Sequence, residues 1–235
     1  MSFCVFSCAA FIVIAMTLLT ALLADDPATP RLTFYNETTG ARLDFSALTL
    51  DNWANKVANM LTDELDLEAG DQITVALPCS WQAACIVLGA LRADMTVNFK
   101  PDTSATVLFC SPDFQWDDYA ADTVLVTDDP FGRGIVELGM DLPDGTIDFG
   151  PTVRFYGDQC SLPCPPLAEH ANDTCPPHTR LLSTGWQDWD SFCRAIINPL
   201  AVVGSAVVVS GPASTERLHH IAGVEKVTAS PFDQS

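Results

Sequence analysis

Positively charged residues are scarce in this sequence of 235 residues. It has 11 Lys and Arg against 30 Asp and Glu, which gives a formal net charge of −19 at pH 7, and its lysines are Lys56, Lys100 and Lys226. A protein that binds nucleic acid needs a cationic surface that neutralises phosphates, so we expect no nucleic-acid partner. The same shortage argues against tight binding of a triphosphate.

Two further absences narrow the chemistry. No Gly-x-Ser-x-Gly turn surrounds Ser183, Ser210 or Ser214, so a hydrolase nucleophile is not indicated. No unit of the sequence repeats. The composition, with 48% hydrophobic and 17% charged residues, is typical of a folded globular protein.

The amino-terminal segment, residues 1–24, is apolar, and the first charged side chain is Asp25. Such a run is long enough to cross a bilayer, which takes about 20 residues. No Lys or Arg precedes it, however, and Leu22 stands where a signal peptide would have a small residue. We therefore expect translation to begin at Met16, with residues 1–15 a mis-called start, and the product to be cytoplasmic. Membrane anchoring through residues 2–24, or a signal peptide, is the alternative.

Short apolar runs alternate with helical patterns from residue 32 onward. This alternation predicts a single domain over residues 25–235, of α/β class, with a mostly parallel sheet and flanking helices. Residues 31–36 and 41–46 flank a turn and predict a hairpin. Leucines near Met16 predict a short amphipathic helix, and the remaining expectations are helices at 49–65, 80–93, 189–204 and 214–222 and strands at 70–77, 96–99, 106–110, 123–127, 180–184, 205–210 and 225–230.

Between about residues 130 and 179 the pattern changes to a loop rich in Pro, Gly, Asp and Cys, with one strand expected at 152–156. Its cysteines and histidines are candidate zinc ligands, but their C-x3-C-x5-H-x4-C-x2-H spacing is not that of a standard finger or ribbon. We favour an inert loop without metal and keep a metal site and a disulfide as alternatives. The candidates are Cys160, Cys164, His170, Cys175 and His178.

Four other cysteines, Cys79, Cys85, Cys110 and Cys193, fall within apolar runs. Free cysteine in such a run behaves as a small core residue, so we interpret them as reduced and structural.

Two blocks of the sequence carry a resemblance. "LTFYNETTGARLDFSALTLDNWANKVANMLTDELDLEAGDQITVALPCSWQAACIVLGALRADMTV" is similar to the amino-terminal subdomain of AMP-dependent synthetases and ligases, the adenylate-forming superfamily. "RLLSTGWQDWDSFCRAIINPLAVVGSAVVVSGP" resembles a later segment of these enzymes. The chain as a whole resembles a family of short actinobacterial proteins that look like truncated versions of them. The resemblance implies the fold of that subdomain.

The resemblance also implies what should stand between the two blocks. These enzymes hold ATP through a loop rich in Ser, Thr and Gly with a Lys, because backbone N–H groups and the lysine bind the phosphates. The interval here, residues 155–180, has one Gly, five Pro and no Lys. "LSTG", Leu182 to Gly185, lacks the following glycine and lysine. The family's later nucleotide motifs and its carboxy-terminal catalytic lysine would lie beyond Ser235.

We therefore expect a non-catalytic homologue without a cofactor, with no catalytic residue identified, whose role is association or ligand binding. The alternatives are a degenerate acyl- or nucleotide-binding protein that acts with a partner, and a membrane-anchored or secreted metal-binding module. The apolar stretch at 200–210 predicts a homodimer or a docked protein partner if it lies near an open sheet edge. A final helix folding back over this stretch is the competing expectation.

Overall fold

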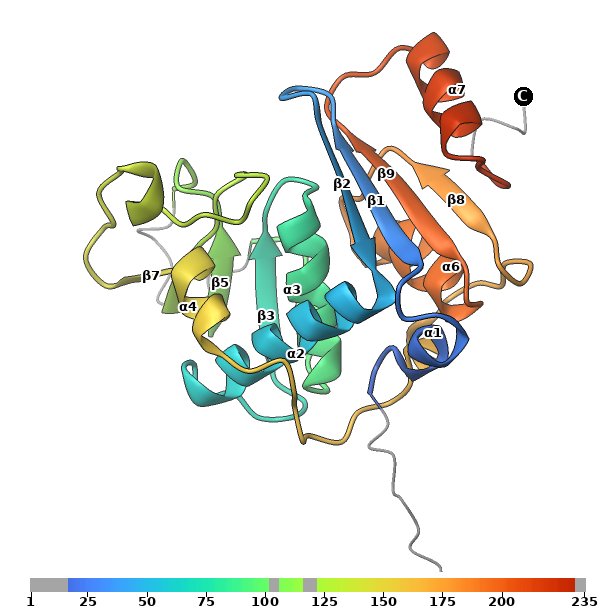
Figure 1. The fold of residues 1–235 in the computed structure, drawn as a ribbon. Helices are drawn as coiled ribbons and strands as arrows, with labels where there is room; N and C mark the ends of the chain where they lie inside the picture. The colour runs from blue at the N-terminus through green and yellow to red at the C-terminus, as the bar shows by residue number, and fades with distance from the viewer. Residues whose placement is uncertain (1–16, 102–105, 116–121, 231–235) are drawn as a thin grey trace, which may run out of the picture.

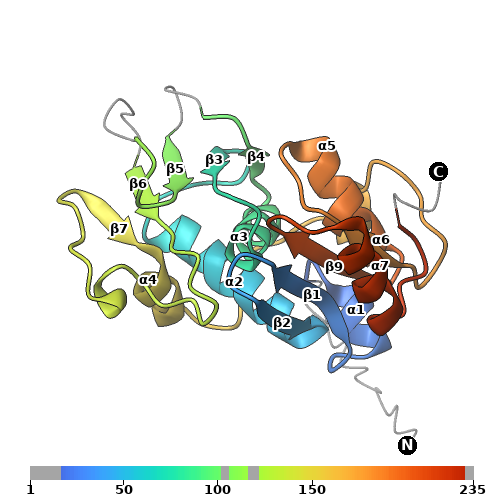
Figure 2. The ribbon, with the colours of Figure 1, turned by 90° about the horizontal axis from the view of Figure 1, so that it is seen from above.

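A computed structural model of the protein describes residues 17–101, 106–115 and 122–230. Its strands form two sheets, named A and B here, which lie on either side of helix α3 (Trp81–Arg92), as Figures 1 and 2 show. The expected α/β class with mostly parallel strands is confirmed. What the sequence did not reveal is the division of these strands between two sheets.

Sheet A combines the beginning and the end of the chain. Its order is β2-β1-β9-β8, and β1 pairs with β9, and β9 with β8, in parallel. The antiparallel pair β1 and β2 is the expected hairpin. The bounds are β1 Pro30–Asn36, β2 Ala41–Ser46, β8 Arg180–Ser183 and β9 Ser205–Ser210.

Sheet B is parallel throughout, with the order β4-β3-β5-β6-β7. Its central strands are buried on both faces, which explains their continuous apolar sequences. The bounds are β3 Gln72–Ala76, β4 Thr96–Asn98, β5 Val107–Cys110, β6 Asp122–Leu125 and β7 Thr146–Asp148.

Helices α2 (Ala47–Asp63) and α3 pack on each other and join the two sheets. The hydroxyl groups of Ser46 and Ser80 cap them by accepting from the backbone N–H groups three residues on, and these caps fix where each helix begins. Every residue of α3 is buried, and α2 contacts β1 and β2 as well as α3. The main hydrophobic core therefore lies around this helix pair.

The other helices lie at the margins. The expected amphipathic segment forms α1, with Leu18, Leu19 and Leu22 buried in the core. The helix expected at 189–204 is interrupted by a π-helical turn, η3. The bounds are α1 Thr20–Asp25, η1 Val136–Leu138, α4 Phe149–Phe155, η2 Leu167–His170, α5 Trp189–Phe192, η3 Cys193–Ile197, α6 Asn198–Ala201 and α7 Thr215–Val224.

Two expected strands are wrong. Residues 152–155 belong to helix α4 and Tyr156 follows its end, because Phe149 and Val153, which share a helix face at i,i+4 spacing, are the side chains that the helix buries. Residues 225–230 form a single bridge, between Leu181 and Ala229. Glu225 ends helix α7 and Lys226 has a positive φ of 53°, so the chain cannot extend there.

The apolar stretch expected at an open edge is covered instead. Strand β9 lies inside sheet A between β1 and β8, and its residues 206–209 are buried. Helix α7 packs Leu218 and Ile221 against Val207 and Val209, which is the competing expectation of a helix that folds back. In Figure 1 this helix lies beside the upper end of sheet A. The homodimer or protein partner stays a prediction, now without this surface as its basis.

Buried charges hold the end of α7 against sheet A. The carboxylate of Glu225, which is 9% exposed, accepts from the Tyr35 hydroxyl at 2.6 Å and from Arg42 and Arg180 at 2.9 and 2.6 Å. Burial alone would raise the pKa of Glu225, but the bonds from Tyr35, Arg180 and Arg42 together lower it below its usual value. The carboxylate thus stabilises the fold in its charged form.

We expect Glu225→Gln to lower the free energy of unfolding at pH 7 by about 1.5–3 kcal/mol, the range for hydrogen bonds to charged groups. Because the folded pKa is depressed, this contribution is present above the unfolded pKa and is lost as pH falls through the folded pKa. Urea unfolding of both proteins between pH 3 and pH 7 measures it. A stability difference that does not shrink at low pH would contradict this assignment.

Within the described residues, no helix has both the length and the apolar character that crossing a membrane requires. The apolar run at 2–24 and the expected start at Met16 lie largely outside the described residues, so both stay predictions.

Candidate functional site

A cleft opens at the carboxyl edge of sheet B. In sheet B, β4 and β5 lie on opposite sides of β3. The chain runs from β3 through α3 to β4, and from β5 to β6 in the opposite direction across the sheet. The connections that follow β3 and β5 therefore diverge. In open parallel sheets, ligands bind in the crevice at such a switch point, outside the carboxyl ends of the strands.

The cleft has a volume of about 190 Å³. Sheet A closes its other side with the ends of β1 and β9, and the Ser210 hydroxyl donates to the carbonyl of Cys79 at 2.9 Å across the junction. Its lining residues are Phe34, Asn36, Thr38, Thr39, Ala41, Leu43, Leu77, Pro78, Cys79, Ser80, Trp81, Gln82, Ser111, Val126, Thr127, Asp128, Pro130 and Ser210.

Gln82 fixes one wall of the cleft. Its side-chain Nε2 donates to the carbonyls of Thr127 and Asp129, at 3.1 and 2.8 Å, and so ties the start of α3 to the segment after β6. The residue is 1% exposed, and its Oε1 has no hydrogen-bond partner among the described residues. A buried carbonyl oxygen is therefore left to accept a hydrogen bond.

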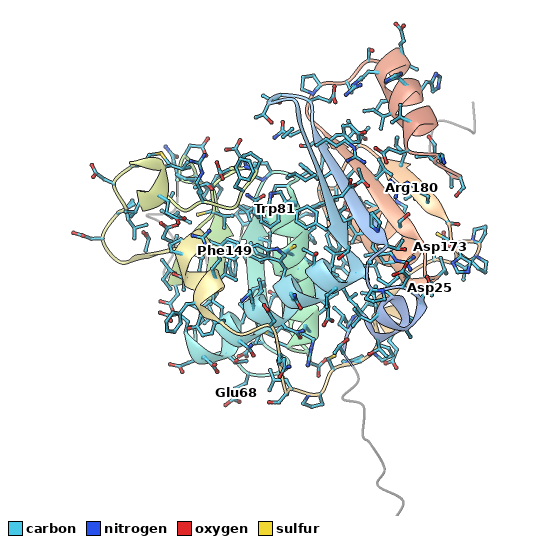
Figure 3. All side chains as sticks on the ribbon, in the orientation of Figure 1. Asp25, Glu68, Trp81, Phe149, Asp173 and Arg180 are labelled. Carbon is cyan, nitrogen blue, oxygen red and sulfur yellow. The ribbon has the colours of Figure 1, made fainter. Side chains whose placement is uncertain are left out.

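Trp81, the residue before it, supplies an unused donor. Its ring contacts Phe45 and Trp53 at centroid distances of 5.1 and 5.0 Å, so its orientation is fixed by packing. The indole Nε1 is buried and without a partner within the described part of the chain. Figure 3 shows Trp81 between the two sheets.

The cleft is electrically neutral apart from its rim. Among the described residues that line it, none is Lys or Arg, and its one acidic residue, Asp128, is exposed.

Burial raises the pKa of the Cys79 thiol to about 12, although a backbone N–H from Trp186 partly offsets this. The thiol therefore stays protonated at neutral pH and is a poor nucleophile. Cys79 also lies in the loop after β3, not within a helix or strand as expected.

Residues 155–180, the interval in which the resemblance implies a phosphate loop, do not line the cleft. The first half of this interval, residues 156–164, forms a strap that is held along α2 and α3 by its carbonyl groups. Asn59 donates to the carbonyls of Gly157 and Gln159, and Asn55 to that of Asp158. Lys56 binds the carbonyl of Tyr156 and the carboxylate of Asp158. No residue of the strap lines the cleft as described.

The five candidate zinc ligands are not assembled into a metal centre in the described residues, which contain no group of three or more His, Cys, Asp or Glu placed to hold an ion. All seven described cysteines are free thiols. Burial lowers the pKa of His170 and raises those of Cys164 and Cys175, and His178 Nδ1 lies 3.3 Å from the carbonyl of Val203. Whether they bind a metal stays a prediction.

Sequence reasoning did not select Trp81 or Gln82. The available signal was their position, at the start of a helix that follows a parallel strand. "LSTG" does end a strand, as expected, but Ser183 and Gly185 line a separate cavity on the outer side of β8.

No family model matches the sequence. A protein of Mycobacterium tuberculosis described as a TIGR03089 family protein is 32% identical in a match that covers 90% of this chain and 95% of that protein. A crystal structure of Brucella canis acyl-CoA synthetase superimposes with a TM-score of 0.71 over 92% of this chain. At 16% identity that likeness concerns the fold alone, and the chain spans 48% of the synthetase.

Proposed function

Since the chain belongs to the TIGR03089 family, we propose that it is a ligand-binding relative of the adenylate-forming enzymes that takes a small uncharged molecule into the cleft and forms no acyl-adenylate. The fold is that of an acyl-CoA synthetase fragment. Fold alone does not carry function, so the proposal rests on the cleft itself.

The observation that carries the proposal is the pair of unused polar atoms at the start of α3. A buried polar group without a partner costs about 1–3 kcal/mol, so most are satisfied in folded proteins. Here Trp81 Nε1 offers a donor and Gln82 Oε1 an acceptor, and both residues line the cleft. A ligand with one donor and one acceptor on an apolar body would satisfy both.

Charge and size favour a small neutral ligand. No described residue of the lining is a cation that would balance a phosphate or carboxylate, and the whole chain is strongly acidic. The volume of about 190 Å³ is below that of pockets that enclose drug-sized ligands. An uncharged amide, lactam or heteroaromatic ring fits both constraints.

The contacts of the strap argue against adenylation activity. A phosphate cradle works through backbone N–H groups that point at the anion, and such oriented donors stabilise developing charge. In residues 156–164 the carbonyl groups are the ones engaged, by side chains of α2 and α3, away from the cleft. We therefore infer that adenylation chemistry has no support from this segment.

The test is calorimetric titration of the protein with uncharged probes (nicotinamide, adenine, benzamide) and charged ones (AMP, ATP, octanoate). We expect binding among the uncharged probes and at least tenfold weaker binding by Trp81→Phe, which removes the indole N–H and keeps an aromatic ring. Trp189→Phe is the matched control, because Trp189 stacks on Phe192 outside the cleft.

An exchange assay tests the second half of the proposal. We expect no carboxylate-dependent incorporation of pyrophosphate into ATP above a heat-killed control. Tight binding of ATP or AMP with exchange would overturn the proposal. Binding of a nucleotide or acyl probe only when a partner protein is added would favour the degenerate enzyme that acts with a partner.

A further inference from the structure

A second cavity lies on the outer side of sheet A and is independent of the cleft. It has a volume of about 440 Å³. It lies beside the carboxyl end of the edge strand β8, next to the bridge between Leu181 and Ala229. Figure 3 shows Asp173, which lines this cavity, on the far side of sheet A from Trp81.

Ser183, the last residue of β8, presents an unused hydroxyl group there. The residue is 9% exposed, and its Oγ has no hydrogen-bond partner in the described part of the chain. A buried hydroxyl without a partner is uncommon in folded proteins. Because Ser183 lines the cavity, a molecule bound there would lie next to this residue.

Arg194 brings a positive charge to the same cavity. Six of the other arginines form ion pairs with carboxylates, and Arg92 is buried among hydrogen-bond acceptors. Arg194 is exposed, and its guanidinium has no ion pair or hydrogen bond with the described residues, although its charge helps to lower the pKa of Asp188. Arg194 thus differs from those six arginines of this acidic chain in having no ion pair with the described residues, and it lines the same cavity as Ser183.

The helix that carries Arg194 is distorted at this point. The turn Cys193–Ile197 is π-helical, and the backbone N–H of Asn198 donates to the carbonyl of Cys193, five residues back. Single π-helical turns inside α-helices are frequent at functional sites. The widened turn places Arg194 and Ala195 on the cavity, with Ser191 and Asn198 before and after them.

We propose that this cavity binds a small molecule through an oxyanion, a carboxylate or a phosphoryl group. The Arg194 guanidinium supplies planar paired donors of the kind that match such oxygens, and the Ser183 hydroxyl donates a further hydrogen bond. Asp173 also lines the cavity, and its Oδ1 accepts from the backbone N–H of Thr174 at 2.7 Å. Its negative charge favours a ligand with a single negative charge.

The experiment titrates the full chain with acetate, butyrate and inorganic phosphate at constant ionic strength, by calorimetry and by chemical shifts in two-dimensional NMR. We expect at least one probe to bind, with Arg194→Gln weakening it at least tenfold and Ser183→Ala about threefold or more. Carboxylates and phosphate as separate arms identify which oxyanion source is used. Ser183→Ala should fold at least as stably as the parent, because it removes a hydroxyl without a partner.

Lys226→Gln is the matched control, since it removes one exposed positive charge outside both cavities. An equal loss of binding in this control, unchanged binding in Arg194→Gln, or no binding of any probe at 10 mM would overturn the proposal. Trp81→Phe should bind these anions as the parent does. The outcome here is therefore separate from that of the cleft.

Discussion

Replacement of Arg92 by methionine is expected to lower the free energy of unfolding by about 3–5 kcal/mol, the usual cost of removing one partner from a buried charged interaction. Arg92 is 1% exposed. Its Nε donates to Asn55 Oδ1 at 3.0 Å, and its Nη1 and Nη2 donate to the carbonyls of Leu162 and Cys160, both at 2.6 Å. Methionine fills part of the volume but leaves these three acceptors unpaired.

The buried charge of Arg92 is balanced through a short chain of contacts. Asn55 donates to Asp51 Oδ2 at 3.0 Å and accepts from Arg92, so the amide lies between the two charged groups. Burial raises the pKa of Asp51, while the bond from Asn55 and the charge of Arg92 work in the opposite direction. Loss of Arg92 should therefore raise this pKa further.

Urea unfolding measures the global effect, and hydrogen exchange of residues 156–164 measures the release of the strap. Arg217→Met is the control, because the Arg217 side chain is 40% exposed, in contrast to the buried Arg92, and pairs with Glu37. It should cost about 1 kcal/mol, near the value for ion pairs at the surface. If Arg92→Met does not fold, Arg92→Lys, which keeps the charge but not the fork of donors, should fold with faster exchange in the strap. Equal losses for Arg92→Met and Arg217→Met would contradict this account.

The sequence predicted the parts of the fold that depend on local pattern. The β1–β2 hairpin follows from two strand-like runs that flank a turn, and α2 and α3 follow from helical patterns at 49–65 and 80–93. The strap was not predictable, because the bonds that hold it join residues about 70 to 100 positions apart in the chain. Such contacts leave no local signal.

The candidate site was likewise predictable only where it depends on local pattern. The sequence predicted a strand at 70–77 and a helix at 80–93, and this order puts residues near Ser80 after the carboxyl end of the strand. That Gln82 reaches the segment after β6 depends on the strand order, which places β5 and β6 on the side of β3 opposite β4. Composition and periodicity do not encode strand order. Arg194 was missed because a single exposed arginine on a helix is ordinarily only part of a solvated surface.

The contact between α2 and α3 gives the second large expected effect. Gly89 is in the interior of α3, where alanine would ordinarily be preferred by about 1 kcal/mol. A Cβ added at Gly89 would stand 2.3 Å from both Cβ and Cγ1 of Val57 and 3.2 Å from the carbonyl oxygen of Ala54. The helices meet at this glycine, so any side chain there forces them apart.

We expect Gly89→Ala to destabilise the protein by about 3 kcal/mol, at the upper end for overpacking in a core, despite the gain in helix propensity. Gly223→Ala is the matched control, because Gly223 is also helical, in α7, and an added Cβ there meets nothing within 4 Å. That variant should gain about 0.5–1 kcal/mol. Urea unfolding of both variants gives the comparison, and effects of the same sign would contradict the close approach of α2 and α3.

A second-site change tests whether Val57 is the cause. Val57→Ala removes Cγ1 but keeps the Cβ that lies 2.3 Å from the added methyl group. The double variant Val57→Ala with Gly89→Ala should therefore recover only part of the stability lost in Gly89→Ala, because the backbones of α2 and α3 must still separate. Full recovery would mean that the valine side chain alone, and not the spacing of the helices, excludes a residue larger than glycine at position 89.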